Sequence, residues 1–583
     1  MRADALSEPM SKRSATYLVL FLSALAVKGS IFLFAADPIV FNKYPYFAEQ
    51  LCKGLDIGER TLDLSPLYLY VNVLFYKIWG ANWGGLAVLQ ILVGSLSCLL
   101  TFAIGARLFD RSVGLAAAVL LLLYGNLTLI ELTLEPEVFV IFFNGLAILA
   151  LIEAGSASSS GPPLGKWLLA GVLIGLSVIT KANGLLLVPG AIAWIWWGAF
   201  RRDRRIAATL LLLLGVSLLV APVTLRNYLK FQDFVLVTAD GGKVFFHGNG
   251  PSATGIERAD LANQAFIEEG QSEPDYAHVL FRNTARALSG SPLKPSECSN
   301  FWVQKTLEHM RAHSGDAFFL ELKKFGFFWS NYEVHDLDST YRNYVTLQGW
   351  PLIAFGIIAS LGIVGMGLAL KRFRRTFLLY WLVLAYLLSV LLFFAASRYR
   401  LPAVPFLSIF AAHALLTLLR LVRQRSWKPL LIGLGASAIL AAGSNLLFSE
   451  EIRRFDRWQA ATRIHYSLEG RMLFKKGLYR EAVAGFRRSV ALEPGFMPAY
   501  DYLGKSLAML GDYEQAERNF MKVVELAPGV DEGYMNLGFL YELMGQRAKA
   551  ASWLGKALAL NPGNERVKRH LEVLGDLPRP AAK

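Results

Sequence analysis

Residues 36–51, with the sequence ADPIVFNKYPYFAEQL, follow an apolar run over residues 15–35. As a helix, that run would be about as long as the hydrocarbon core of a bilayer is thick. Asp37 is the first acidic residue after the run, and Pro38 ends the helix behind it. A second proline, Pro45, can begin a short amphipathic helix that lies in the membrane interface. The stretch therefore predicts a membrane span followed by an acid held at the membrane surface.

Asp37 has two interpretations when it is taken alone. The plainer one is a polar residue that marks the boundary of a membrane helix. The other is a functional acid at the membrane surface. Only the rest of the chain can distinguish them.

The composition is that of a multi-pass membrane protein. The 583 residues are 54% hydrophobic and 13% aromatic, and the mean hydropathy is +0.40, which is rare among soluble proteins. The net charge is +14, but the basic residues cluster in short loops between apolar runs, so membrane topology explains them better than nucleic-acid binding. Lys12 and Arg13 precede the first run, and no convincing cleavage site follows it, so we expect an uncleaved anchor.

The chain contains three cysteines, Cys52, Cys98 and Cys298. Cys98 lies inside an apolar run, where we expect it to pack. Cys52 and Cys298 fall on the same predicted side of the membrane and could form a disulfide or remain free. No C-x-x-C spacing occurs, which argues against a cysteine metal site.

The apolar runs predict about eleven membrane helices. The expected spans are residues 15–35, 84–106, 113–131, 136–154, 166–181, 184–200, 207–224, 350–370, 376–396, 402–422 and 429–448. The fifth and sixth spans are short and nearly continuous, so the boundary between them stays open. Residues 66–79 are apolar but too short to span, and we expect an interfacial or re-entrant segment there.

Basic residues predict the orientation of these spans. Loops 201–205, 371–375 and 420–428 each carry four basic residues, and all three face the cytoplasm when the N-terminus does, as the positive-inside pattern requires. The segments outside the cytoplasm are then the loop 36–83, the large loop 225–349 and everything after residue 448.

The C-terminal part of the chain repeats with a step of 34 residues. The step relates Gly470, Gly504 and Gly538, and it also relates Gly477, Gly511 and Gly545, Ala482, Ala516 and Ala550, Phe486, Phe520 and Leu554, and Pro494, Pro528 and Pro562. This is the period and pattern of tetratricopeptide repeats, in which small residues sit where paired helices cross and the proline ends the second helix. Residues 564–575 are expected to form a capping helix. The groove of such a stack most often binds a peptide or protein, although it can also serve as a scaffold.

The expected fold class is therefore all-α. A polytopic membrane helix bundle with a mixed extracytoplasmic loop region is expected over residues 1–448. A linker over 449–464 would connect it to an α-solenoid of tetratricopeptide repeats over 465–583.

Charged residues gather at the expected outer ends of the membrane helices. They are Asp37, Glu131, Glu135, Glu137, Lys181, Arg226, Arg398 and Arg400. Singly, each could mark a helix end or anchor a helix at the interface. Together, acids and cations beside apolar grooves suit a lipid-linked phosphate substrate. The cations would neutralise the phosphate, and an acid would accept a proton from the acceptor.

An ordered set of short motifs over roughly residues 15–425 gives a more specific indication. The motifs are Asp37 with Tyr44, Tyr46 and Ala48, SPLY at 65–68, GLSVITK at 175–181, APVTLRNY at 221–228, GG at 241–242 with HGNGP at 247–251, and RYRLP at 398–402. The chain resembles the multi-pass glycosyltransferases that use polyprenyl-phosphate sugars, the superfamily of protein O-mannosyltransferases and bacterial aminoarabinose transferases.

The resemblance implies a C-type glycosyltransferase fold and an inverting transfer with Asp37 as the catalytic base. Glu135 or Glu137 lies where the family places a second acid; the choice stays open, with Glu135 preferred. The other residues implied to hold the lipid phosphate or the sugar are Tyr44, Lys181, Arg226, His247, Asn249, Arg398 and Arg400. The resemblance implies a lipid-linked sugar donor. It gives no support for a metal, although metal dependence stays open.

The chain departs from the protein-mannosylating branch in one position. That branch commonly carries an Asp-Glu pair in the first outer loop, whereas Pro38 follows Asp37 here, so the broader bacterial branch fits better. His309 and His313 are four residues apart and could bind a metal from one helical face, but no H-E-x-x-H arrangement accompanies them. A solvated helix face is the preferred interpretation.

Two functional hypotheses follow. The first is a glycosyltransferase of the cell envelope, in a bacterial inner membrane, with its N-terminus in the cytoplasm and its repeats on the periplasmic side, where they would bind a protein or peptide partner. Its substrates would be a polyprenyl-phosphate sugar and a protein, lipid or glycan acceptor, and no nucleic acid would be involved. The second is a non-enzymatic transport or assembly component for lipid-linked glycans, with the repeats as a docking platform.

Overall fold

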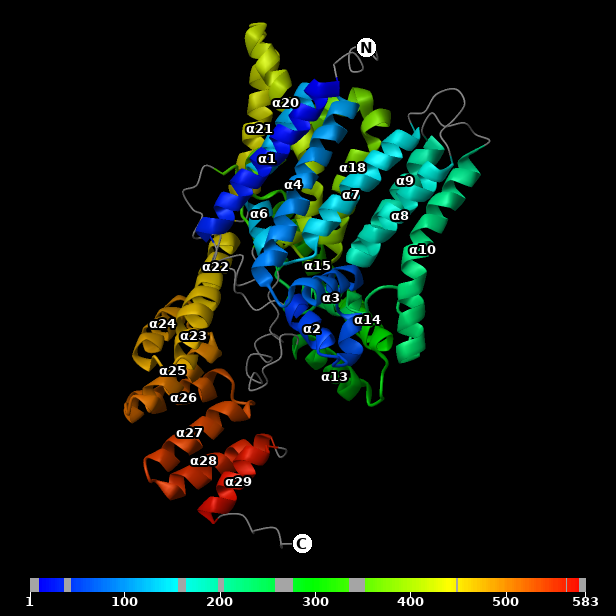
Figure 1. The fold of residues 1–583 in the computed structure, drawn as a ribbon. Coiled ribbons are helices and arrows are strands. Elements are labelled where there is room, and N and C mark those ends of the chain that lie inside the picture. Colours follow the sequence, from blue (N-terminus) through cyan, green and yellow to red (C-terminus); the bar gives the residue numbers. More distant parts are fainter. Residues whose placement is uncertain are drawn as a thin grey trace. The chain divides into compact units, whose positions relative to one another are not determined.

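The computed structural model describes residues 10–35, 43–155, 164–197, 204–256, 276–334, 352–446, 449–561 and 564–575. These residues form two compact units, one containing the helices up to α21 and the other the helices from α22 to α29 (Figure 1).

The first unit is built around long apolar helices. They are α1 (Met10–Ala35), α4 (Trp83–Leu108), α7 (Glu137–Gly155), α10 (Arg205–Phe231), α17 (Phe355–Ala369), α18 (Phe373–Leu392), α20 (Val404–Arg423) and α21 (Trp427–Leu446), with the shorter α8 (Gly165–Thr180) and α9 (Leu187–Trp197) among them. Six helical stretches of the described chain are long and apolar enough to cross a membrane, and a bent helix pair would make seven. Helices occupy every expected span, which confirms a polytopic α-helical bundle. The count of about eleven remains a prediction.

The expected span 113–131 is not one straight helix. It consists of α5 (Arg111–Leu122) and α6 (Gly125–Leu132), which meet at an angle of 54°. At the break, the Tyr124 hydroxyl donates to Glu333 Oε1 over 2.7 Å and the Asn126 amide donates to Glu333 Oε2 over 2.9 Å. Both side chains are buried, so the chain bends where its polar groups reach a distant carboxylate that satisfies them.

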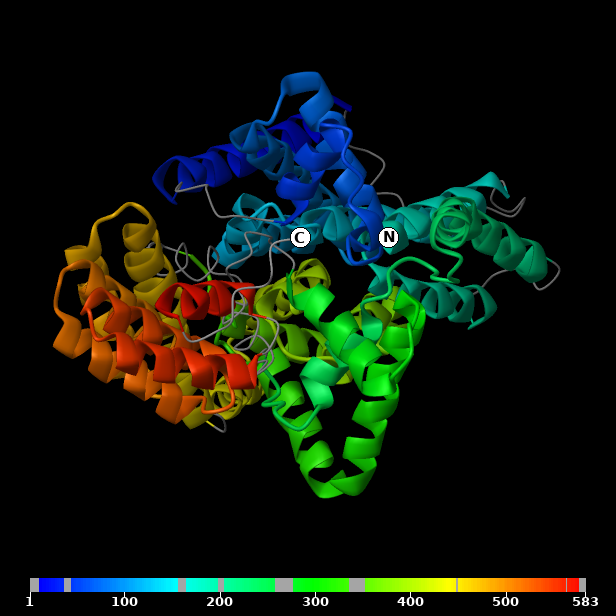
Figure 2. The same ribbon diagram turned by 90° about the horizontal axis from the view of Figure 1, so that it is seen from below.

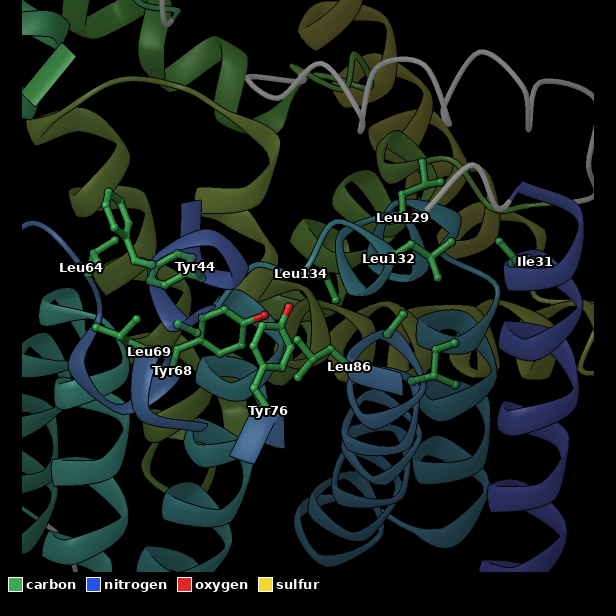
Figure 3. Packing of buried hydrophobic residues seen from close by; sticks show 14 residues of the cluster. Ile31, Tyr44, Leu64, Tyr68, Leu69, Tyr76, Leu86, Leu129, Leu132 and Leu134 are labelled. Atoms are coloured by element: carbon green, nitrogen blue, oxygen red, sulfur yellow. The ribbon is translucent and has the colours of Figure 1, made fainter. Parts of the chain in front are cut away.

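Two short helices form where the sequence predicted interfacial segments, and their placement in the membrane interface remains a prediction. They are α2 (Lys43–Cys52) and α3 (Pro66–Trp79). The buried side of α2 carries Tyr44 and Phe47, which pack with Tyr68 of α3 and Leu132 of α6 in one hydrophobic cluster (Figure 3). This packing holds the buried side of α2 against α3 and α6.

A buried ion pair joins α1 to α6. Lys28 Nζ donates to Glu131 Oε1, and both side chains are fully buried. A Cβ added at Gly94 of α4 would overlap the Glu131 carboxylate, so only glycine leaves room for the pair. Because neither charged group is exposed to water, the electrostatic attraction of its partner is what offsets the cost of burying it.

Removing one partner of this pair should destabilise the protein more than removing both. Glu131→Gln leaves the Lys28 ammonium buried without its partner, and Lys28→Met does the same to the Glu131 carboxylate. We expect each variant to lower the free energy of unfolding by about 3 kcal/mol. The double variant should recover a large part of that loss. Thermal unfolding of the detergent-solubilised protein measures the effect, and equal, additive losses from the two substitutions would contradict a coupled pair.

The region between α10 and α17 is helical where the structure describes it. Its helices are α11 (Gly241–Asn249), α13 (Tyr276–Ser289), α14 (Pro295–Ala312) and α15 (Ser314–Trp329). The described residues contain an isolated β-bridge between Ile256 and Ala395 and no strand. The mixed loop region expected over 225–349 is thus a set of packed helices in its described part.

The second unit is a stack of antiparallel helix pairs. It contains α22 (Ser449–Gln459), the π-helical segment η6 (Ala460–Arg471), α23 (Met472–Lys475), α24 (Tyr479–Leu492), α25 (Met497–Met509), α26 (Tyr513–Leu526), α27 (Asp531–Leu543), α28 (Arg547–Leu560) and α29 (Glu565–Leu574). The expected linker 449–464 is therefore helical. The expected capping helix is α29.

The same contact recurs in each repeat and explains the spacing of the small residues. A Cβ added at Gly470, Gly504 or Gly538 would lie 2.2, 2.6 or 2.5 Å from Phe486, Phe520 or Leu554, respectively. The helices of each pair thus cross where only glycine fits, as predicted. The turns between paired helices contain Gly477, Gly511 and Gly545 with φ of 75°, 81° and 72°, a conformation that favours glycine. Pro562 lies outside the described residues.

Candidate active site

Two buried carboxylates lie between α6 and α7. Glu135 is in the connecting loop and is 4% exposed, whereas Glu137 begins α7 and is fully buried. Leu134, just before them, has the left-handed φ of 57°, which is unusual for a branched side chain and is held here because Leu134 is itself buried. The tight turn directs both acids into the protein at the end of the bundle.

Two cations from distant parts of the chain meet these acids. Lys181, the residue after α8, forms an ion pair with Glu137. Arg398 of the short helix α19 (Ser397–Arg400) places Nη1 3.5 Å from Glu135 Oε2. The ring of Tyr399 lies under both cations, 4.3 Å from Lys181 Nζ and 5.0 Å from the Arg398 guanidinium carbon. We call Glu135, Glu137, Lys181, Arg398 and Tyr399 the carboxylate cluster.

Burial sets the electrostatics of the cluster. It raises the pKa of Glu135 to about 7, against the opposing effect of the Arg398 cation and with the added repulsion of Glu137. Burial likewise lowers the pKa of Lys181, while its partner Glu137 opposes that shift. Glu135 is therefore a carboxyl group that takes up a proton readily near neutral pH.

A layer of hydrogen bonds supports Glu135. Gln90 of α4 donates from Nε2 to the Tyr68 hydroxyl and, over 3.1 Å, to the backbone oxygen of Glu135. The Tyr44 hydroxyl donates to Ser65 Oγ over 3.0 Å, and the Tyr44 and Tyr68 rings are 4.9 Å apart. Burial raises the pKa of Tyr44, and the nearby Glu135 charge adds to that shift, so Tyr44 belongs to the surroundings of the cluster.

Arg226 lies at a different place. It follows Pro222 near the end of α10, donates to the Tyr70 hydroxyl over 3.2 Å, and bonds the Asn227 side chain. Arg226 lines a surface hollow of about 520 Å³ together with Pro222, Leu225, Leu229 and Lys230. None of its contacts in the described part of the chain is with the carboxylate cluster.

His247 and Asn249 belong to α11 and face other helices. Asn249 accepts from Lys324 Nζ of α15 over 2.6 Å and donates to the Leu392 carbonyl at the end of α18 over 2.8 Å. The His247 ring lies 4.6 Å from that of Phe281. In this structure, the contacts of Asn249 join three helices.

Arg400 is enclosed by the protein. Its side chain is 3% exposed, and its guanidinium donates to the carbonyls of Phe327, Phe328, Ser330 and Tyr332 and to Glu333 Oε2. These bonds organise the chain segment that follows α15. Arg398 and Arg400, two residues apart, thus face different surroundings: Arg398 pairs with Glu135, whereas Arg400 pairs with Glu333.

Asp37, the expected base, lies outside the described residues. The described chain brings together Glu135, Glu137, Lys181, Arg398 and, beside them, Tyr44. The hydrogen bonds given above for Arg226, Asn249 and Arg400 are with other residues, and the ring contact given for His247 is with Phe281. Sequence reasoning missed Gln90 and Lys28. A polar residue within a strongly apolar span was the signal that could have found both.

No described residues form a metal-binding group of three or more His, Cys, Asp or Glu. The His309 and His313 rings lie 4.6 Å apart, and the His313 side chain approaches the His309 carbonyl. Cys52 is exposed and Cys298 is buried, and both are free.

Comparisons with known proteins match the two units separately. Residues 63–225 match the family described as dolichyl-phosphate-mannose-protein mannosyltransferase. Residues 498–529 and 531–564 match tetratricopeptide-repeat families. These matches confirm the resemblance that the motifs indicated, and the first segment contains three members of the carboxylate cluster, Glu135, Glu137 and Lys181. No curated protein matches the chain.

Solved structures that match the chain at low sequence identity include an oligosaccharyltransferase and ArnT. The apo oligosaccharyltransferase of Archaeoglobus fulgidus is 13% identical with a TM-score of 0.43, over 79% of this chain and 59% of that one. ArnT from Cupriavidus metallidurans bound to undecaprenyl phosphate is 16% identical with a TM-score of 0.40, over 89% of this chain and 80% of that one. The present chain thus spans about three-fifths of the length of the oligosaccharyltransferase.

Proposed function

We propose that the chain is an integral membrane glycosyltransferase that moves a sugar from a polyprenyl phosphate to an acceptor outside the cytoplasm. The observation that supports it most is the carboxylate cluster, which pairs two acids with two cations at the end of the helix bundle. Three of its members lie in the segment that matches the mannosyltransferase family.

The proposed reaction is a single displacement at the anomeric carbon of the sugar. The acceptor oxygen forms a bond to that carbon as the bond to the phosphate oxygen breaks, so the configuration inverts. Asp37 takes the proton of the acceptor hydroxyl, and the polyprenyl phosphate leaves with the electron pair. A positioned base typically contributes 10²–10⁴-fold to such a rate.

Lys181 and Arg398 are proposed to stabilise the negative charge of the leaving phosphate. Each cation is held by a buried acid, Lys181 by Glu137 and Arg398 by Glu135. An arriving phosphate adds negative charge beside Glu135, whose pKa is already raised by burial. Glu135 therefore takes up a proton when the donor binds and releases Arg398 to the phosphate.

This role of Glu135 predicts a pH dependence of donor binding. Donor binding requires neutral Glu135, so the donor KM should rise as pH increases between about pH 6 and pH 8, across the raised pKa. Glu135→Gln, a permanently neutral mimic, should give a low KM that no longer changes over this range. Initial rates at varied donor concentration measure both. An unchanged slope in the Gln variant would assign the pH dependence to another group.

The direct test of the function is transfer by purified protein in proteoliposomes. A panel of radiolabelled polyprenyl-phosphate sugars is supplied with a cell-envelope fraction as the source of acceptor, and protein-free vesicles serve as the blank. We expect label in a non-lipid or new lipid product for one donor class. Donor that crosses the bilayer while no product forms would instead support the transport hypothesis.

We also propose that the protein lies in a bacterial inner membrane with its repeats in the periplasm. An odd number of spans would put them on the same side as Asp37, where the repeats could recruit a partner or acceptor protein. In spheroplasts, an added protease should remove a tag placed after residue 583 and leave an N-terminal tag intact. Protection of the C-terminal tag would place the repeats in the cytoplasm.

A further inference from the structure

Helix α15 carries a stripe of exposed apolar side chains. Phe318, Leu322 and Phe325 are 63%, 47% and 47% exposed, and their spacing of four and three residues places them on one helical face. Phe319, 64% exposed, widens the stripe. Trp329 continues it, with its ring 6.5 Å from that of Phe325. So many exposed aromatic groups on one helix indicate a surface that something apolar covers.

The other face of α15 is firmly held. Lys324, Phe327 and Phe328 on that face are buried. Lys324 Nζ donates to the Leu391 carbonyl near the end of α18 over 2.8 Å, and to Asn249 of α11. The exposed stripe therefore belongs to an ordered helix that is fixed at one end of a membrane span.

The hairpin of α14 and α15 projects sideways from the helix bundle. Figure 2, which looks along the bundle from below, shows these two helices in green extending away from the other helices of the first unit. Helix α14 packs on α11, with Ser299 Oγ 2.8 Å from the Gly242 nitrogen and the Phe246 and Trp302 rings 4.5 Å apart. The hairpin thus runs across the direction of the spans.

The surface next to the stripe indicates that lipid covers it. Helix α18, to which α15 is bonded, exposes Leu388 and Leu392 at 40% and 53% near its outer end, on a span whose exposed apolar side chains face lipid. The bond from Lys324 to the Leu391 carbonyl places the C-terminal part of α15 beside the end of α18, so the stripe and these exposed leucines belong to neighbouring helices. A helix with one apolar face that lies in the membrane plane is the usual form of an interfacial anchor.

We propose that α15 is an interfacial membrane anchor, with Phe318, Phe319, Leu322 and Phe325 inserted into the outer leaflet. The polar residues of α14, such as Lys305 and Glu308, then face water. Because Lys324 bonds both α18 and Asn249, the anchor fixes α11 at the level of the membrane surface. This inference is independent of whether the chain transfers sugar.

Fluorescence quenching in proteoliposomes tests the anchor. Cys52 is the exposed native cysteine and is replaced by serine, while Cys98 and Cys298 are buried. Phe318→Cys is labelled with a polarity-sensitive dye, and Lys305→Cys on α14, 51% exposed, is the matched control. We expect lipids spin-labelled near the headgroup to quench the label at 318 several-fold more than the label at 305, and aqueous iodide to show the opposite order.

Two outcomes would overturn the proposal. Equal iodide quenching at both positions would place the stripe in water. A label at 318 that neither quencher reaches would mean that protein covers the stripe, either a second copy or a partner. Phe325→Cys provides a second labelling position on the same stripe, for use if Phe318→Cys disturbs folding. A label at 325 should show the same order of quenching as expected for a label at 318.

Discussion

Asp37→Asn should lower the rate of sugar transfer by about 10²–10⁴-fold. The proposed displacement needs one base to take the proton of the acceptor hydroxyl, and an amide cannot accept it. The substitution keeps the size of the side chain, and the amide can still form hydrogen bonds. Protein yield and thermal stability should therefore stay as in the wild type. Initial transfer rates at equal protein levels in proteoliposomes measure the effect.

Asp56→Asn is the matched control for this variant. Asp56 lies in the same expected outer loop, is exposed, and pairs with Lys230 over 2.6 Å at the surface, where ion pairs contribute little. Transfer by this variant should stay within about twofold of the wild type, since only a surface pair is lost. Full activity of Asp37→Asn would show that Asp37 only marks the boundary of a helix.

Lys181→Met should lower transfer by about 10²–10³-fold, because it removes a cation proposed to stabilise the leaving phosphate. The substitution also leaves the carboxylate of Glu137 buried without its partner. A loss of activity could thus come from a lost catalytic charge or from a destabilised site. The single variant cannot separate these two causes.

The double variant Lys181→Met with Glu137→Gln separates them. It removes both charges of the buried pair, so folding stability should return toward that of the wild type. Transfer should nevertheless stay low, because the phosphate still lacks its cation. Recovery of transfer together with stability would show that Lys181 has a structural role only. Thermal unfolding and transfer rates are measured on the same preparations.

The local features of the fold could be predicted from the sequence. Long apolar runs determine where the helices of the first unit lie, because backbone groups in lipid must be satisfied within a helix. The step of 34 residues predicted the repeats because each repeat packs mainly within itself and against its neighbour in the chain. Gly470, Gly504 and Gly538 each sit against a large side chain one helix away, and such short-range packing leaves a periodic trace in the sequence.

The long-range ion pairs of the first unit, which include those of the candidate site, could not be predicted in the same way. Lys28 meets Glu131, Lys181 meets Glu137, and Arg398 meets Glu135 across separations of 103, 44 and 263 residues. Each residue marks a polar position in an apolar setting, and the sequence alone does not say which acid faces which cation. It also gave no sign that Arg400 would be enclosed by carbonyl groups while Arg398, two positions earlier, contacts an acid.

The bend between α5 and α6 likewise depends on a contact between distant residues that the sequence does not reveal. Hydropathy is continuous across residues 113–131, so the sequence predicted one span. The bend depends on Glu333, more than two hundred residues away, which binds both Tyr124 and Asn126. Hydropathy reports how apolar a segment is, whereas the path of the backbone depends on where distant polar groups find partners.

The most direct test of the account is to identify the lipid product by mass spectrometry. Purified wild-type protein in proteoliposomes receives the active polyprenyl-phosphate sugar and the acceptor fraction, and Asp37→Asn is treated identically. The account predicts that the wild type releases free polyprenyl monophosphate, one molecule for each sugar transferred, and that the variant releases none. Donor lipid that stays intact in the wild type while the acceptor is present, or equal release by both proteins, would contradict it.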